Sequence, residues 1–171
     1  SKFHKTNIEV YPLVSEEAAL KEALHNASKG VERFSLVTSG RTLSAADTDR
    51  ICSIYRHIKQ HTPIHLCASL GLLTKEQLIQ LRESGVERYH CNMETAPSYF
   101  VKLCTTHTPE EKMQTIAWAK EAGLSICSGG IIGMGESAEQ RIELAVTLQK
   151  IGVDSIPVNV LNPIPGTPLA D

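Results

Sequence analysis

The sequence lacks the long apolar segments and paired cysteines that mark membrane proteins and small secreted domains. No apolar run in the 171 residues approaches the ~20 residues of a membrane span, and the first residues do not resemble a signal peptide. The five cysteines are scattered and form no C-x-x-C pair. A net charge of −2 does not favour binding to nucleic acid or to an anionic membrane. We therefore expect a cytoplasmic protein that binds neither.

Helix starts and helix ends follow one another regularly along the chain. Glycine ends four amphipathic stretches and precedes a β-rich run each time, as a left-handed C-cap does. Ser or Thr followed by acidic or Gln residues resembles an N-cap at five positions. We expect helices near 15–29, 44–60, 74–84, 108–122 and 137–150, and strands near 33–37, 64–68, 87–91, 124–128 and 155–160.

Strict alternation of helices with short apolar strands predicts an α/β fold with a parallel sheet. A doubly wound sheet and a (β/α) barrel both satisfy this pattern. Polar segments follow every strand, which favours the barrel, because a barrel builds its site from all strand ends. The sequence therefore predicts a partial TIM-type barrel of five parallel strands with outer helices. Five strands cannot close such a barrel, so we expect residues 1–171 to be an incomplete domain, with at least one strand missing before Ser1 and its C-terminal part missing after Asp171.

The segment "YHCNMETAP" places polar side chains at the end of the third predicted strand. Alternation along a strand puts His90, Asn92 and Glu94 on one face and Cys91 on the other. A carboxylate beside an amide at this edge could hold a ribose, a polyol or a metal ion. In the competing interpretation, Glu94 caps the next helix or pairs with a surface lysine.

Three cysteines, Cys67, Cys91 and Cys127, lie in or at the end of three different predicted strands. Buried cysteine is most often a small apolar residue of the core. Three thiols at similar depth in one barrel could instead bind an iron–sulfur cluster. Cys91 and Asn92 face opposite ways in a regular strand, so Cys91 fits such a set only if a bulge intervenes.

The segment "LSICSGGIIGMGES" is rich in glycine at the end of the fourth predicted strand. Gly129 and Gly130 would let a ligand approach the backbone closely, or would form a bulge or bend at a barrel corner. Asn159, at the end of the last predicted strand, offers an amide to a ligand.

Taken together, "YHCNMETAPSYF", "LCTTHTPEEKMQTI", "AGLSICSGGIIGMGES" and "NVLNPIPGTPLAD" resemble the biotin synthase family of the radical S-adenosylmethionine (SAM) superfamily. This resemblance implies a (β/α) barrel that inserts sulfur into dethiobiotin with 5′-deoxyadenosyl radicals from SAM. It also implies a C-x-x-x-C-x-x-C loop for a 4Fe–4S cluster. That loop is absent here, so we expect the 171 residues to be inactive alone. Members of the family are usually dimers.

The resemblance also implies roles for single residues. Asn92 and Glu94 match positions that hold the ribose and adenosyl region of SAM, and Lys112 matches a basic position associated with its carboxylate. The glycines after Cys127 would admit cofactor and substrate, and Asn159 matches a residue near the substrate.

Cys67 and Cys127 match two ligands of an auxiliary iron–sulfur cluster that supplies sulfur. Where a third ligand cysteine is expected, the sequence has Ser35. Either Cys91 replaces it or the auxiliary cluster is of another kind. Two other functions therefore stay open: a radical SAM paralogue with a different substrate, and a non-catalytic barrel fragment that binds no cluster.

Overall fold

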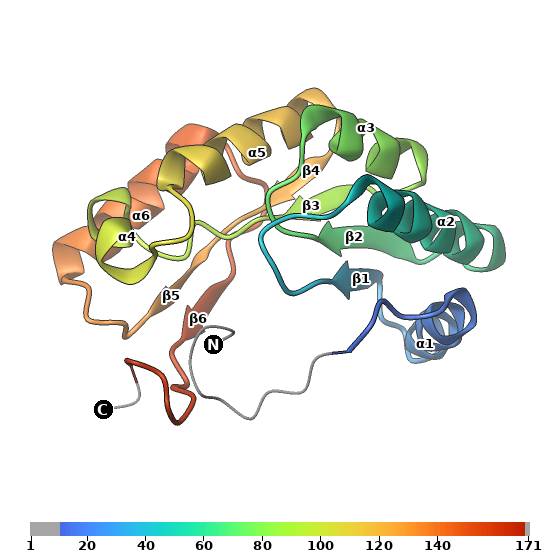
Figure 1. Cartoon of the computed structure of the whole chain (residues 1–171), viewed down its shortest axis with the longest axis horizontal. Helices are drawn as coiled ribbons and strands as arrows, with labels where there is room; N and C mark the ends of the chain where they lie inside the picture. Colours follow the sequence, from blue (N-terminus) through green and yellow to red (C-terminus); the bar gives the residue numbers. More distant parts are fainter. Residues whose placement is uncertain (1–10, 170–171) are drawn as a thin grey trace.

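The computed structural model describes residues 11–169, in which helices and strands alternate (Figure 1). The helices are α1 (Glu16–Ser28), α2 (Ala45–His61), α3 (Lys75–Glu83), α4 (Pro97–Leu103), α5 (Pro109–Glu121) and α6 (Ala138–Ile151). The strands are β1 (Arg33–Val37), β2 (His65–Ser69), β3 (Arg88–His90), β4 (Ser125–Cys127), β5 (Gly130–Ile132) and β6 (Val158–Val160). Residues 1–10 and 170–171 lie outside the described residues.

All five predicted helices are confirmed, with each end within one residue of its expected position. Their Ser or Thr N-caps accept a backbone N–H from the first turn, and Thr74, Thr108 and Ser137 complete capping boxes. Gly152 ends α6 in the left-handed conformation, with φ of 69°. Local capping chemistry therefore sets these helix boundaries.

The strands form a parallel sheet in the order β1-β2-β3-β4, and β5 pairs with β6 in parallel. Two single bridges join these groups, one between Glu94 and Gly130 and one between Cys127 and Ser155. The six strands therefore fill five strand positions of one curved sheet. Strands β4 and β5 share one of these positions, because β5 continues in the direction of β4 after a break. The helices lie along the outer side of the arc of strands (Figure 1). The predicted partial barrel is confirmed.

Two elements differ from the sequence expectation. The predicted strand 124–128 is broken at Ser128 and Gly129, and the chain returns to the sheet as β5 instead of leaving it as a loop. Helix α4 was not expected, because it has seven residues and its N-cap, Ala96, makes no side-chain cap.

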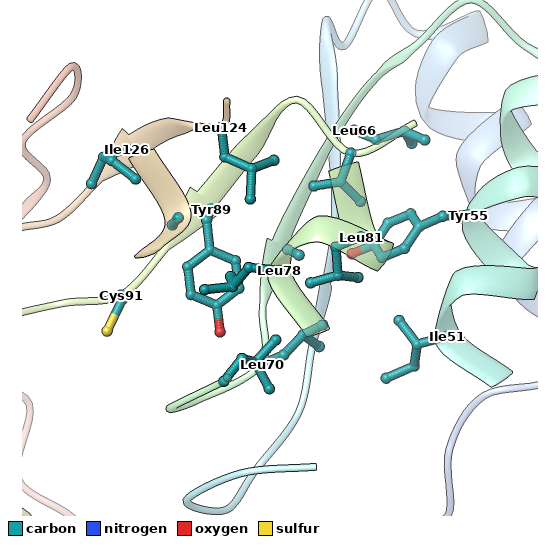
Figure 2. Packing of buried hydrophobic residues seen from close by; sticks show 14 of the residues in the cluster. Ile51, Tyr55, Leu66, Leu70, Leu78, Leu81, Tyr89, Cys91, Leu124 and Ile126 are labelled. Carbon is teal, nitrogen blue, oxygen red and sulfur yellow. The ribbon is translucent and has the colours of Figure 1, made fainter. Parts of the chain in front are cut away.

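The core lies between the sheet and the helices. Leu66, Tyr89 and Ile126, from neighbouring strands, are fully buried there. Figure 2 shows Leu66 and Tyr89 close to Leu78 and Leu81 of α3. Because side chains alternate along a strand, the residues next to these project to the concave face. That face and the carboxyl ends of the strands carry the candidate site.

Candidate functional site

A pocket of about 230 Å³ lies at the carboxyl ends of β1, β2 and β3. Thr38 follows β1, Ser69 ends β2, and Asn92 and Glu94 follow β3. In β/α barrels the active site lies at this end of the strands. The sequence prediction that polar groups gather here agrees with the position of the pocket.

Glu94 and Asn92 meet Lys112 of α5 in this pocket. The Lys112 ammonium donates a hydrogen bond to the Asn92 carbonyl oxygen at 2.7 Å and lies 3.5 Å from the Glu94 carboxylate. The Lys112 side chain is 8% exposed and that of Glu94 is 38% exposed. Lys112 is therefore held by these two residues, while the Glu94 carboxylate remains accessible from the pocket. Glu94 pairs with a lysine that is buried, which differs from the surface pairing of the competing interpretation.

The Asn92 side chain ties two strand ends together. Its Oδ1 accepts the Gly129 N–H at 2.9 Å, and the Glu94 N–H donates to the Gly129 carbonyl oxygen at 3.1 Å. Glu94 is the one non-glycine residue with positive φ among the described residues, at 69°. The strand end that carries both polar side chains is thus fixed by the backbone of residue 129.

Gly129 and Gly130 are required by close packing of the backbone. A Cβ atom at Gly129 would lie 1.8 Å from the Pro157 carbonyl oxygen. One at Gly130 would lie 2.6 Å from a Leu144 methyl carbon and 2.7 Å from the Glu94 carbonyl oxygen. This geometry agrees with the alternative of a bend at a barrel corner. A role of these glycines in cofactor binding stays a prediction.

Cys67 and Cys127 project to the concave face of the sheet. Their neighbours Leu66 and Ile126 belong to the core cluster on the opposite face, whereas Cys67 and Cys127 do not. The Cys127 Sγ atom lies 3.2 Å from Nδ1 of His90, which is its register partner in β3. Burial lowers the pKa of His90, so its ring is neutral near pH 7.

The surroundings of Cys67 are polar and positively charged. Burial raises the pKa of its thiol, whereas a hydrogen bond with Ser35 and the charges of Arg33 and Arg88 act in the opposite direction. Cys127 also acts on this thiol, so the two cysteines share one neighbourhood. The Nη1 atom of Arg33 is buried and has no hydrogen-bond partner among residues 11–169. A buried unpaired donor beside Cys67 suits an anionic thiolate-bound group at this face.

Cys91 follows β3 and lines the pocket, but it belongs to the core cluster, whereas Cys67 and Cys127 do not. It is 6% exposed and packs in the core cluster with Tyr89 and Leu70, both close to it in Figure 2. Within the described part of the chain, no three His, Cys, Asp or Glu side chains are grouped so that they could hold a metal ion. The structure therefore does not bring Cys91 together with Cys67 and Cys127.

Asn159 is exposed on β6, in register with Ile131, and does not line the pocket. Arg41 and His107 do line it, although sequence reasoning did not single them out. Arg41 forms an ion pair with Glu111 of α5. Burial, together with the nearby Lys112 and Arg41 charges, lowers the pKa of His107, and Glu111 opposes this. The signal that could have identified Arg41 is its position in the polar segment after β1.

A buried carboxylate fixes the loop between β5 and α6. The Glu136 side chain is 2% exposed. Its two oxygens accept the N–H groups of Gly133 and Met134, each at 2.8 Å, and the Arg141 Nε–H at 2.8 Å. Burial alone would raise the pKa of Glu136, but these donors outweigh it and lower the pKa to about 2. Glu136, at the end of the glycine-rich segment, therefore has a structural role, because its carboxylate is occupied by donors of this loop and of α6.

Comparison with known proteins agrees with this arrangement. The sequence pattern of the radical SAM superfamily matches residues 2–148. The chain is 52% identical over 171 residues to a biotin synthase of Akkermansia muciniphila, covering 100% of this chain and 53% of the relative. It is 54% identical over 169 residues to a biotin synthase of Porphyromonas gingivalis, covering 99% and 51%. The chain thus spans about half the length of the curated relatives that it matches.

Among solved structures, methylornithine synthase (PylB) superimposes with a TM-score of 0.87 at 21% identity, covering 96% of this chain and 49% of that chain. At this identity the match supports the fold alone. None of the helices within residues 11–169 is long and apolar enough to cross a membrane.

Proposed function

This chain belongs to the radical SAM superfamily, whose enzymes use SAM and a 4Fe–4S cluster, and we propose that the protein containing it is a biotin synthase. The observation that carries the proposal is identity above 50% to biotin synthases over essentially every residue of the chain. The reaction proposed is insertion of sulfur into dethiobiotin, a sulfurtransferase activity that the 171 residues alone would not have.

The pocket residues fit SAM. Glu94 offers an accessible carboxylate for the ribose hydroxyls of the adenosyl group, and Lys112 holds that carboxylate and the Asn92 carbonyl in place. Arg41, although paired with Glu111, also lines the pocket and would offer its guanidinium to the carboxylate of SAM. Bound together, SAM and the 4Fe–4S cluster supply the 5′-deoxyadenosyl radical. The 171 residues contain no C-x-x-x-C-x-x-C sequence for that cluster.

Two thiols on the concave face fit an auxiliary iron–sulfur site. We assign Cys67 and Cys127 to it, with Arg33 as a nearby buried donor. Ser35 is the register partner of Cys67 in β1. The thiol of the expected third ligand is therefore absent from that place, and the type of this site stays open.

The decisive test uses the full-length protein, reconstituted with iron and sulfide without oxygen. With SAM, a reductant and dethiobiotin, it should form biotin and bind two clusters by iron counting. A paralogue with another substrate, which Ser35 favours, would form 5′-deoxyadenosine but no biotin and would bind one cluster. A non-catalytic protein would bind no iron. Either of these two results would refute the proposal.

A cytoplasmic location and a homodimer complete the proposal. The scattered free cysteines support the first, because they suit a reducing compartment. Analytical ultracentrifugation of the full-length protein tests the second, and a monomer at micromolar concentration would contradict it.

A further inference from the structure

Tyr55 of α2 is fully buried, and its hydroxyl group reaches the backbone of two strands. It donates a hydrogen bond to the Cys67 carbonyl oxygen of β2 at 2.7 Å and accepts the Leu36 N–H of β1 at 3.3 Å. Burial raises the pKa of Tyr55 well above its usual value, so the hydroxyl stays protonated and can donate. Figure 2 shows the ring reaching from α2 toward the sheet. One side chain of a helix therefore bridges β1 and β2.

The two groups that Tyr55 binds belong to one position of the parallel hydrogen-bond ladder. Two residues after Leu36, the Thr38 N–H donates directly to the Ser69 carbonyl oxygen at 3.1 Å. By the same spacing, the preceding position of the ladder pairs the Leu36 N–H with the Cys67 carbonyl oxygen. The Tyr55 hydroxyl contacts both of these groups. It therefore helps to set how β1 lies against β2 at this level of the sheet.

This level of the sheet also carries residues of the auxiliary site. Ser35 precedes Leu36 and is the register partner of Cys67. The carbonyl of Cys67 is held by Tyr55 from the core side, whereas its thiol lies on the concave face with that of Cys127. Hydrogen bonds from neighbouring groups commonly fix the orientation of metal ligands. The Tyr55 hydroxyl can do so here through the backbone of the cysteine.

We propose that Tyr55 is a positioning residue for the auxiliary iron–sulfur site, because its hydroxyl fixes the backbone of Cys67 against β1. This rests on the proposed function, in which Cys67 and Cys127 hold that site. Without the hydroxyl, the Leu36 N–H and the Cys67 carbonyl oxygen can pair with each other directly. The two strands then close at this level, and the Cys67 thiol moves relative to that of Cys127.

The test compares Tyr55→Phe with Tyr89→Phe in the full-length protein, reconstituted with iron and sulfide without oxygen. Tyr89 is the matched control, because it is also fully buried and its hydroxyl also donates to a backbone carbonyl, that of Gly71, at 2.7 Å. Each change removes one buried hydroxyl from the same core, so both variants should lose stability to urea by similar amounts. Only Tyr55→Phe should change the electron paramagnetic resonance spectrum of the auxiliary cluster and release its iron to a chelator about tenfold faster.

Unchanged spectra and unchanged iron release in Tyr55→Phe would overturn the proposal. Equal changes in the two variants would also overturn it, because they would report a loosened core. If the unchanged protein assembles only one cluster, the auxiliary site of the proposed function fails instead.

Alkylation of the cluster-free protein, followed by peptide mass spectrometry, then decides the role of Tyr55. In Tyr55→Phe, Cys67 should react about threefold faster than in the unchanged protein, because its strand is less restrained, while Cys127 should react at the unchanged rate. A Cys67 rate equal to that of the unchanged protein would refute the positioning role.

Discussion

Glu136 offers the sharpest test of the electrostatics in this structure. Replacing it with glutamine keeps the size of the side chain but leaves one oxygen where two had accepted backbone N–H groups. The amide NH₂ then faces one of the Gly133 and Met134 donors, and the charge opposite Arg141 is lost. The substitution therefore removes the ionised carboxylate that these donors stabilise, while the donors themselves remain.

The size of the effect follows from that pKa. A shift from the ordinary value near 4.5 to about 2 corresponds to roughly 3 kcal/mol of stability at neutral pH. Because the folded-state pKa is the lower one, this stability is fully present above about pH 4.5. It is lost as the pH falls toward about 2.

Urea denaturation of the full-length protein measures this contribution to the free energy of unfolding. At pH 7, Glu136→Gln should lower the free energy of unfolding by about 2–3 kcal/mol. The exposed Glu110→Gln control should stay within about 0.5 kcal/mol of the unchanged protein. The gap between the unchanged protein and Glu136→Gln should close between about pH 4.5 and pH 2. A gap that stays constant over this range would refute the reasoning, because a purely steric defect does not titrate.

Three further outcomes are expected. Glu94→Ala should weaken SAM binding by about 1–3 kcal/mol in equilibrium dialysis, the usual loss for hydrogen bonds to a charged group; unchanged affinity would count against its role. Gly129→Ala should cost more than about 3 kcal/mol in thermal unfolding, because its Cβ meets a carbonyl oxygen. Gly30→Ala, with open space around it, should cost only about 1 kcal/mol for its left-handed backbone; equal losses would contradict the packing argument. Cys127→Ser should lower the iron content of the reconstituted protein while Cys91→Ser leaves it unchanged, and the reverse pattern would move the auxiliary site to the core.

The helices could be predicted because their signals are local. Ser15, Ser44 and the other N-caps bond groups within their own first turn, so a short stretch of sequence contains the interaction. The two faces of β2 could also be predicted from local sequence. Because side chains alternate along a strand, Leu66 points to the core and Cys67 to the opposite face.

The missed features depend on contacts between distant segments. The return of the chain to the sheet at β5 requires Gly129 to pack against Pro157, and no local signal reports a neighbour 28 residues away. The place of Arg41 in the pocket depends on its pairing with Glu111, 70 residues away. The hydrogen bond from Lys112 to the Asn92 carbonyl oxygen could not be predicted either. The family resemblance indicates a basic residue at position 112 but not the group to which it binds.

The left-handed backbone at Glu94 limits which residues can replace it. Residues other than glycine, asparagine and aspartate adopt this conformation at a cost of about 1–2 kcal/mol. Here the conformation also positions the N–H that bonds to Gly129. Of the three tolerant residues, only aspartate keeps a carboxylate. Almost every single substitution at position 94 would therefore lose either the carboxylate in the pocket or the stability of this strand end.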